Sequence, residues 1–420
     1  MLRRFLIPNI ILRRNVTALY VTGDKAMENF AVLSPFLEID ERMKNFNEIK
    51  ENIERRKLPI NSETLKDEYE LFSAVENRKK ELEDRRLDIA KQMKVEATEG
   101  LRLQGKIIRE DLKKLKETSY HLEDQFVHNF LNIPNIIHEK TPKVKEIVYS
   151  HLEKPEIEHP NEKIQELIEF YDPACYYMKG DAAQFDLFTP LDLCDYLRDA
   201  GFIKFSNPDF VRSIIAEGAA LNPENLFQLK EEAIDNKLNL LHLSGSGSFI
   251  NYLPFISKLI VFPTQLPLKL INTGKIYSST NHYEHQNLYK TVQSTCCQAF
   301  IATTNEESFN EVVEEMIKHL KKIYEKFDHH FQIVLYPADM LNNSESFKIG
   351  IEMYSVIKQK YIEVGNFSYH SDFISKRLLF NYKLDKSIEF PHIYSGTVMN
   401  VMKVLVNLIE CNKNLNNFIK

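Results

Sequence analysis

The feature of this chain that most constrains its fold is a charged, proline-free stretch from Leu65 to Phe130. It carries two apolar series with spacings of three and four, which place each series on one stripe of a helix. The members are Phe72, Val75, Leu82, Ile89 and Met93, with Lys79 and Arg86 at the intervening seam positions, and then Ile108, Leu112, Leu115, Leu122 and Phe126. Gly100 and Gly105 are expected to bracket a reversal between them. The stretch therefore predicts an antiparallel helical coiled-coil arm.

The charges of this arm leave its role open. From Leu65 to Gln125 there are 14 Lys or Arg residues and 15 Asp or Glu residues, so only an uneven distribution could favour RNA. Phosphate contacts need Lys and Arg but little sequence order. The candidate RNA-binding residues are Arg78, Lys79, Lys80, Arg85, Arg86, Lys113 and Lys114. The alternative interpretation is a solvated helix face with charge pairs one turn apart.

The pattern changes after the arm, where Pro134 and Pro142 end the helix and begin a linker. Beyond it, helical stretches (191–200 and 306–326) alternate with β-rich runs (331–336 and 349–353). This order predicts an α+β domain in which helices flank an antiparallel sheet. We place the domains at residues 1–22, 23–135 and 136–420.

The first of these segments resembles a targeting sequence. It holds Arg3, Arg4, Arg13 and Arg14 among apolar residues, and the first acidic residue is Asp24. Such an Arg-rich, acid-poor segment predicts a mitochondrial presequence and a location in the mitochondrial matrix, with an ordinary basic tail as the alternative. No apolar run approaches the roughly 18 residues of a membrane span, so no membrane partner is expected.

Composition excludes some functions. A net charge of -6 rules out a uniformly basic nucleic-acid coat, so any RNA contact must use a local basic face. The cysteines form no C-x-x-C pair and no zinc-like spacing, which predicts buried, reduced thiols and no structural metal. They are Cys175, Cys194, Cys296, Cys297 and Cys411.

Several short motifs are similar to those of seryl-tRNA synthetases, class II enzymes with an N-terminal helical arm and a C-terminal antiparallel catalytic domain. They are Leu131 to Pro134 after the arm, Met178 to Ala183, Ala200-Gly201-Phe202 leading to Pro208, and Pro391 to Gly396 followed by Leu405 to Glu410. The third resembles the family's first class II motif, so the resemblance implies a dimer interface at Gly201, Phe202 and Pro208. The last resembles the third motif, a strand and helix beneath ATP.

The same register exposes departures from the family. The family's arginine that holds the α-phosphate falls on Ser278, and its acidic residue two positions later falls on Thr280. The glutamate that contacts adenine in the family falls on Gln298, and the arginine that pairs with the γ-phosphate falls on Lys403. The run 244–248, Ser-Gly-Ser-Gly-Ser, holds no acid where the family's Thr-x-Glu loop senses the serine amino group, and is more typical of a turn than of a phosphate loop. Only Glu363 is retained, where a carboxylate for metal and ATP is expected.

A hydroxyl cannot replace an arginine fork, and a lysine replaces it only in part. The resemblance is strongest to the catalytically degenerate seryl-tRNA synthetase paralogues of insect mitochondria. It implies a non-catalytic protein without a cofactor, which pairs with the active mitochondrial seryl-tRNA synthetase or with itself and contacts mitochondrial serine tRNA. The alternatives are a diverged but active mitochondrial seryl-tRNA synthetase, a general mitochondrial nucleic-acid-binding protein and a purely structural scaffold.

Overall fold

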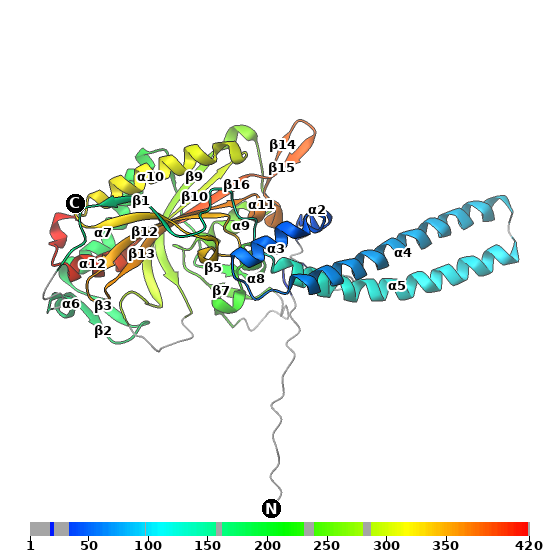
Figure 1. Ribbon diagram of the computed structural model, residues 1–420, viewed down its shortest axis with the longest axis horizontal. Helices are drawn as coiled ribbons and strands as arrows, with labels where there is room; N and C mark the ends of the chain where they lie inside the picture. Colours follow the sequence, from blue (N-terminus) through cyan, green and yellow to red (C-terminus); the bar gives the residue numbers. More distant parts are fainter. Residues whose placement is uncertain are drawn as a thin grey trace, which may run out of the picture.

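The computed structural model describes residues 17–20, 33–96, 98–156, 162–230, 239–279 and 287–418. It consists of a globular body from which two long helices project as an arm (Figure 1). Most of the expected presequence lies outside the described residues, namely residues 1–16 and 21–22, and so does Thr280.

The arm consists of α4 (Ser62–Val95) and α5 (Glu99–Leu131), which confirms the predicted antiparallel helix pair. The side chain of Asn61 begins α4 by accepting from the backbone N–H groups of Glu63 and Thr64. The residues predicted for the seam are buried or half-buried, with the exception of Arg86, which is exposed. The apolar spacing therefore identified the packing stripe of both helices.

The predicted position of the reversal was wrong. α4 ends at Val95 and α5 already begins at Glu99, so Gly100 and Gly105 both lie inside α5. The Thr98 hydroxyl accepts from the backbone N–H of Leu101 at 3.4 Å, so this N-cap begins the helix before either glycine is reached.

Two short helices, α2 (Ile39–Lys44) and α3 (Phe46–Arg55), pack at the base of the arm. Directly after α3, the buried Arg56 donates only to oxygen atoms of the surrounding chain. Its Nε bonds to Asn52 Oδ1 at 3.0 Å. Its two Nη atoms bond to the backbone oxygens of Asn342 (3.0 Å), Asn135 (2.9 Å) and Glu345 (2.6 Å). Burial lowers the pKa of Arg56 to about 10, so the side chain stays cationic at neutral pH.

An eight-stranded sheet forms the centre of the body, in the order β1-β11-β12-β13-β16-β10-β9-β4. Neighbouring strands are antiparallel, except that β4 pairs parallel with β9. In that order the strands are Glu146–His151, Phe331–Leu335, Phe347–Ser355, Lys360–Ser371, His392–Asn400, Gln293–Thr303, Leu268–Tyr277 and Ile203–Lys204. The prediction of an antiparallel sheet flanked by helices is confirmed.

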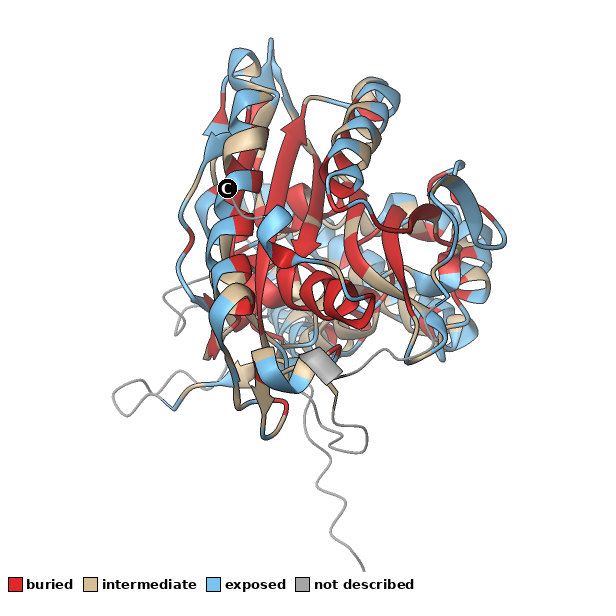
Figure 2. Cartoon of the chain, turned by 90° about the vertical axis from the view of Figure 1, so that its left-hand side faces the viewer, coloured by how far each residue is buried: buried red, intermediate tan, exposed pale blue. Residues whose placement is uncertain are grey.

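Helices cover one face of this sheet and build the main core. They are α7 (Gly180–Asp199), α10 (Phe309–Glu325) and α12 (Val401–Glu410). Because α12 is apolar on nearly every side, it is enclosed almost completely. Figure 2 shows the central strands buried along most of their length and the outer helices exposed on one side.

A second core lies against α8 (Ser213–Gly218), α9 (Leu253–Ile256) and α11 (Phe373–Leu378). The remaining elements are α6 (Glu162–Leu167), β2 (Ile168–Phe170) with β3 (Tyr176–Met178), β5 (Phe210–Arg212) with β7 (Leu241–Leu243) and β6 (Phe227–Gln228), and β8 (Ile260–Val261) with β14 (Asn381–Leu384) and β15 (Ser387–Glu389). Among the residues described, no helix combines the length and apolar character needed to cross a membrane.

Replacement of Arg56 by Met is expected to lower the free energy of unfolding by about 3 kcal/mol or more, because several buried oxygens lose their donor at once. Equilibrium urea denaturation measures this value. The matched control is Lys57→Met, which removes a cation that is 76% exposed and bonds to Asp339 at the surface, and should cost less than about 1 kcal/mol. Equal losses in the two variants would contradict the role of Arg56 as a buried connection.

Candidate functional site

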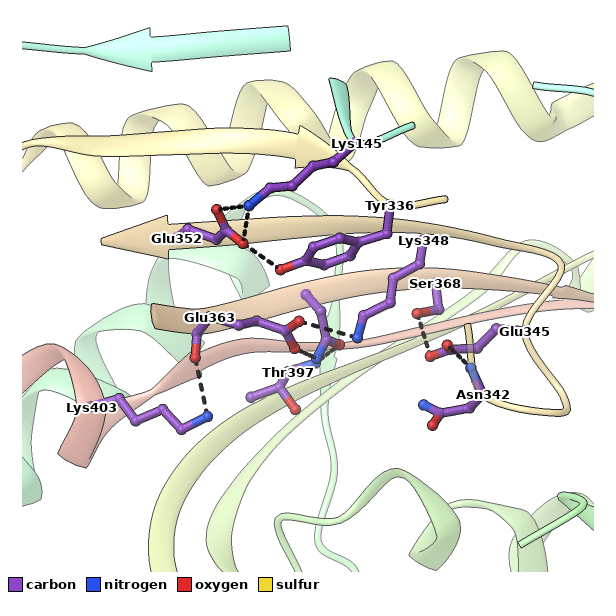
Figure 3. Close-up of polar contacts among 11 residues, drawn as sticks. Lys145, Tyr336, Asn342, Glu345, Lys348, Glu352, Glu363, Ser368, Thr397 and Lys403 are labelled. Carbon is purple, nitrogen blue, oxygen red and sulfur yellow. Dashed lines mark hydrogen bonds and ion pairs between the residues drawn. The ribbon is translucent and has the colours of Figure 1, made fainter. Parts of the chain in front are cut away.

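The face of the sheet opposite the main helical core carries polar side chains. In β12, Phe347, Ile349 and Ile351 point into the core. Lys348 and Glu352 alternate with them and therefore lie on the other face, where Figure 3 shows them with the charged groups of neighbouring strands. This is the face that carries Glu363 and Gln298, two of the positions singled out from the sequence.

Glu363 is paired with a cation of its own chain. Its Oε2 lies 3.1 Å from Lys348 Nζ, and its Oε1 accepts from Asn366 Nδ2 at 2.8 Å. Burial alone would raise the pKa of Glu363, but Lys348 and Asn366 outweigh it and hold that pKa below its usual value. Burial alone would lower the pKa of Lys348, and the carboxylates of Glu345 and Glu363 raise it instead. Both groups are therefore charged at neutral pH.

Lys403, which the sequence predicts at the position of the family's γ-phosphate arginine, lies in α12 and contacts this strand. Its Nζ donates to the backbone oxygen of Glu363 at 3.0 Å, and Asn400 caps its helix by accepting from the Lys403 N–H at 3.1 Å. The ammonium is thus held by a protein oxygen at the edge of the site.

A second ion pair lies beside the first. Lys145 Nζ contacts both oxygens of Glu352 at 2.6 and 2.7 Å, and the same carboxylate accepts from Gln332 Nε2 at 2.7 Å and from the Tyr336 hydroxyl at 2.8 Å. The Tyr336 ring covers Gly350, where an added Cβ would lie 2.3 Å from the ring. These groups fill the surface of β12.

The register of β12 and β13 explains why two lysines are needed. A bulge between Ile351 and Glu352 leaves Glu352 directly opposite Glu363. Like charges in such a pair are destabilising, so each carboxylate has its own cation, Lys145 or Lys348. With Glu345 and Lys403, the charged side chains labelled in Figure 3 are three lysines and three glutamates, and the formal charges cancel.

The other positions predicted from the sequence are Gln298, which lies in β10, and Ser278, which follows β9. Gln298 is 3% exposed, and its Oε1 accepts from the Thr397 hydroxyl at 2.9 Å. Ser278 is exposed just after β9, where its N–H donates to the oxygen of Val292 at 2.8 Å. The structure therefore joins Lys403 to Glu363 directly. It joins Gln298 to Glu363 only through Thr397 and Asn366, because the N–H of Thr397 donates to Asn366 Oδ1 at 3.2 Å and Asn366 donates to Glu363.

The run 244–248 forms a turn, and all five of its backbone N–H groups have partners within the chain. Ser244 and Gly245 donate to Asp209 O, Ser246 to Asp209 Oδ1, Gly247 to Lys275 O and Ser248 to Gly245 O. Gly245 has a φ of +89°, and an added Cβ there would lie 2.1 Å from Lys275 O. A phosphate cradle needs free N–H groups, so this geometry supports the interpretation as a turn.

The residues implied for the dimer interface differ in exposure. Gly201 and Pro208 are at the surface, whereas Phe202 is 2% exposed and belongs to the main core. Next to Phe202, the β4 residue Ile203 is 57% exposed. Leu187, Phe188 and Leu191 on α7 are exposed as well.

The arm residues proposed for RNA also fall into two groups. Lys79 is half-buried and its Nζ lies 3.2 Å from Glu76 in the seam. Arg78 is exposed and pairs with Glu81 at 2.8 Å. The remaining candidates are all exposed: Lys80, Arg85, Arg86, Lys113 and Lys114.

Sequence reasoning missed Lys348, Lys145 and Glu352. The alternation of charged or small residues with large apolar residues from Phe347 to Met353 was a usable signal, because it marks a strand with one polar face. It does not reveal which charges meet, since that depends on the bulged register.

Replacement of Lys348 by Met should cost about 3 kcal/mol of stability near neutral pH, because the carboxylate of Glu363 loses its main cation. Without Lys348 the pKa of Glu363 rises. In the parent protein, the lowered pKa of Glu363 stabilises the fold at pH values above the ordinary pKa of a glutamate. This stabilisation is lost as the pH falls toward the lowered pKa. In the variant, protonation of Glu363 relieves the buried charge, so the difference between the proteins should narrow as the pH falls from about 7.5 to about 5.

Denaturation curves at several pH values measure this difference. Adding Glu363→Gln to Lys348→Met should recover most of the loss at neutral pH, since no uncompensated charge remains. A loss that does not change with pH, and is not recovered in the double variant, would contradict the ion pair.

The chain is similar to known proteins in both sequence and fold. Residues 252–412 match the family described as the tRNA synthetase class II core domain (G, H, P, S and T). The chain is 32% identical over 413 residues to the serine–tRNA synthetase-like protein Slimp of Drosophila melanogaster, covering 94% of this chain and 89% of that protein. It is 24% identical over 339 residues to the mitochondrial serine–tRNA ligase of Mus musculus, covering 75% of this chain and 64% of the ligase.

The fold is that of a solved relative. The cytoplasmic serine–tRNA ligase of Naegleria fowleri, in complex with AMP, superposes with a TM-score of 0.72 at 17% identity and covers 88% of this chain and 91% of its own. Because sequence identity to the Drosophila protein extends over nearly the whole length of both chains, this protein belongs to the seryl-tRNA synthetase family.

Proposed function

We propose that this chain is a non-catalytic mitochondrial paralogue of seryl-tRNA synthetase, which acts in the matrix as a partner subunit of the active mitochondrial enzyme and binds mitochondrial serine tRNA. The observation that carries the proposal is the ion pair between Lys348 and Glu363, 3.1 Å apart on the sheet face where the family resemblance places ATP.

The electrostatics of this face support the absence of serine activation. Formation of an adenylate needs cations placed in advance around the phosphates, and such groups supply much of the rate. Here the formal charges cancel, Lys348 is bound to Glu363, and Lys403 donates to a backbone oxygen. Ser278, at the position of the α-phosphate arginine, cannot make a bidentate charged contact.

The distribution of charge along the arm supports RNA binding. Residues 78–109, around the tip, contain ten Lys or Arg and six Asp or Glu. The rest of the two helices, residues 62–77 and 110–131, contains four Lys or Arg and ten Asp or Glu. The half of the arm that extends farthest from the body (Figure 1) is therefore basic, as an electrostatic contact with a phosphate backbone requires.

The surface at α7 and β4 supports a partner subunit. Ile203 is 57% exposed on β4, the edge strand of the sheet, and α7 exposes Leu191 one helical turn before Asp195, which pairs with Lys204 of β4. Large apolar side chains next to an open strand edge favour association with another chain. The resemblance implies a dimer at this segment, so the mitochondrial seryl-tRNA synthetase or a second copy of this chain is the proposed occupant.

The purified chain is expected to show no serine-dependent exchange of pyrophosphate into ATP, even at high ATP, because the cations that would stabilise the reacting phosphates are paired or absent. The mitochondrial seryl-tRNA synthetase of the same organism is the positive control. Exchange by the chain alone would favour the alternative of a diverged but active synthetase.

Co-expression with that synthetase should give a one-to-one complex by native mass. Ile203→Asp should dissociate it, because the variant places a charge on the exposed edge strand. Leu87→Asp is the matched control, since Leu87 is 54% exposed and lies on α4 of the arm, whereas β4 belongs to the eight-stranded sheet of the body. A homodimer sensitive to Ile203→Asp would indicate self-association, and insensitivity of both assemblies would reject this surface.

Reversal of Arg85 and Arg86 to Glu should weaken binding of serine tRNA and reduce the slope of log affinity against log salt by about one for each lost phosphate contact. The control reverses Lys50 and Lys66, which pair with Glu63 and Glu70 near the arm base. Equal effects would reject the tip as the RNA contact. Binding without preference for serine tRNA would favour a general mitochondrial nucleic-acid-binding protein.

A further inference from the structure

The segment Thr17–Tyr20 lies within the expected presequence, yet it is packed into the folded protein. Ala18 is 4% exposed and Leu19 is 1% exposed, and both belong to the second core of the body. That core also contains Ile214 and Ile215 of α8. Two buried apolar side chains are unusual for a segment that is removed before the protein functions.

Polar contacts fix the same segment to α8. The Thr17 hydroxyl donates to Glu217 Oε2 at 2.6 Å, and the backbone N–H of Leu19 donates to that oxygen at 2.8 Å. Hydrogen bonds to a charged acceptor are stronger than bonds between neutral groups. Glu217 therefore holds a segment that lies about 200 residues earlier in the chain.

Tyr20 connects the segment to the arm. Its hydroxyl donates to Glu123 Oε1 of α5 at 2.6 Å, and its ring packs on the arm-base cluster that contains Phe126 and Phe130. Burial and the nearby carboxylate raise the pKa of Tyr20, so the hydroxyl keeps its proton and remains a donor. Leu19 and Tyr20 thus contact two different cores, one in the body and one at the arm base.

We infer that residues 17–20 form an N-terminal strap that stays in the working protein and holds the base of the arm on the body. Removal of the strap would expose the apolar contacts of Leu19 and leave Glu217 and Glu123 without these donors. Any processing that yields the working protein therefore cuts before Thr17, and the boundary at residue 22 expected from the sequence is too late. Only the processing step rests on the proposed mitochondrial location.

Two truncations test the strap. Both keep Met1, and the chain then resumes at Thr17 in one and at Val21 in the other, so their difference measures residues 17–20 alone. The chain that lacks the strap should have a Tm lower by about 3 to 6 °C. Equal Tm values would overturn the inference. If the shorter chain does not fold, Leu19→Ala and Tyr20→Phe in the full chain should each lower Tm, and no change in either would likewise overturn it.

A double-mutant cycle identifies the contact. Glu217→Ala should lower Tm in the chain that keeps residues 17–20. It should have little effect in the chain that resumes at Val21, since Thr17 and Leu19, the donors to Glu217, are already absent there. Equal effects in both chains would show that Glu217 acts elsewhere.

The mass of the N-terminal peptide of the protein recovered from mitochondria tests the processing step. A first residue at or before Thr17 is expected, and a start at Val21 or later would overturn retention of the strap. Recovery of the protein outside mitochondria would instead reject the proposed location, and the Tm comparison would still decide the strap.

Discussion

The position of the arm depends on one buried cation, Arg56. Its guanidinium donates to the carbonyl oxygens of Asn135 in the linker and of Asn342 and Glu345 in the body. A guanidinium suits this place because its donors lie in a fixed plane and reach several oxygens at once. Since the carboxylate of Glu345 also accepts from Ser368 at 2.8 Å, the same connection extends from the arm base to the polar face of the sheet.

On that face, stability and chemistry make opposite demands. A catalytic site contains charged groups that have no partner until the substrate binds, and such groups reduce the stability of the free protein. Here the bulge places Glu352 opposite Glu363, and Lys145 and Lys348 neutralise them. A phosphate that approached Lys348 would have to displace Glu363 and leave its carboxylate without that cation. Under the proposed function, the pairing that stabilises the fold also works against nucleotide binding, for the same physical reason.

The sequence predicted what depends on periodicity. The seam of α4 and α5, the antiparallel sheet and the turn at residues 244–248 follow from local patterns of apolar, polar and glycine residues. The reversal of the arm was misplaced because glycine was weighed above the cap formed by Thr98. The partners of Glu363 could not be predicted, because a one-residue bulge decides which side chains of β12 and β13 face each other. Phe202, predicted at an interface, is buried in the core while Ile203 next to it is exposed, because successive side chains of an extended chain point to opposite sides.

The strap shows how a compositional signal and a structural role can overlap. Arginine-rich, acid-poor sequence identifies a targeting segment by its average character, and Thr17–Tyr20 contains no acidic residue that would set it apart from that segment. What distinguishes these residues is their partners, Glu217 and Glu123, which lie in distant parts of the chain. The basic residues lie at the far end of the arm, so a small change in orientation at the base moves them a long way. Contacts that fix the base therefore also restrict the positions that these charges can occupy. If the arm binds RNA, Arg56 and the strap therefore influence the affinity for RNA without contacting it. Each of them restricts the orientations that the arm, and with it the basic tip, can adopt.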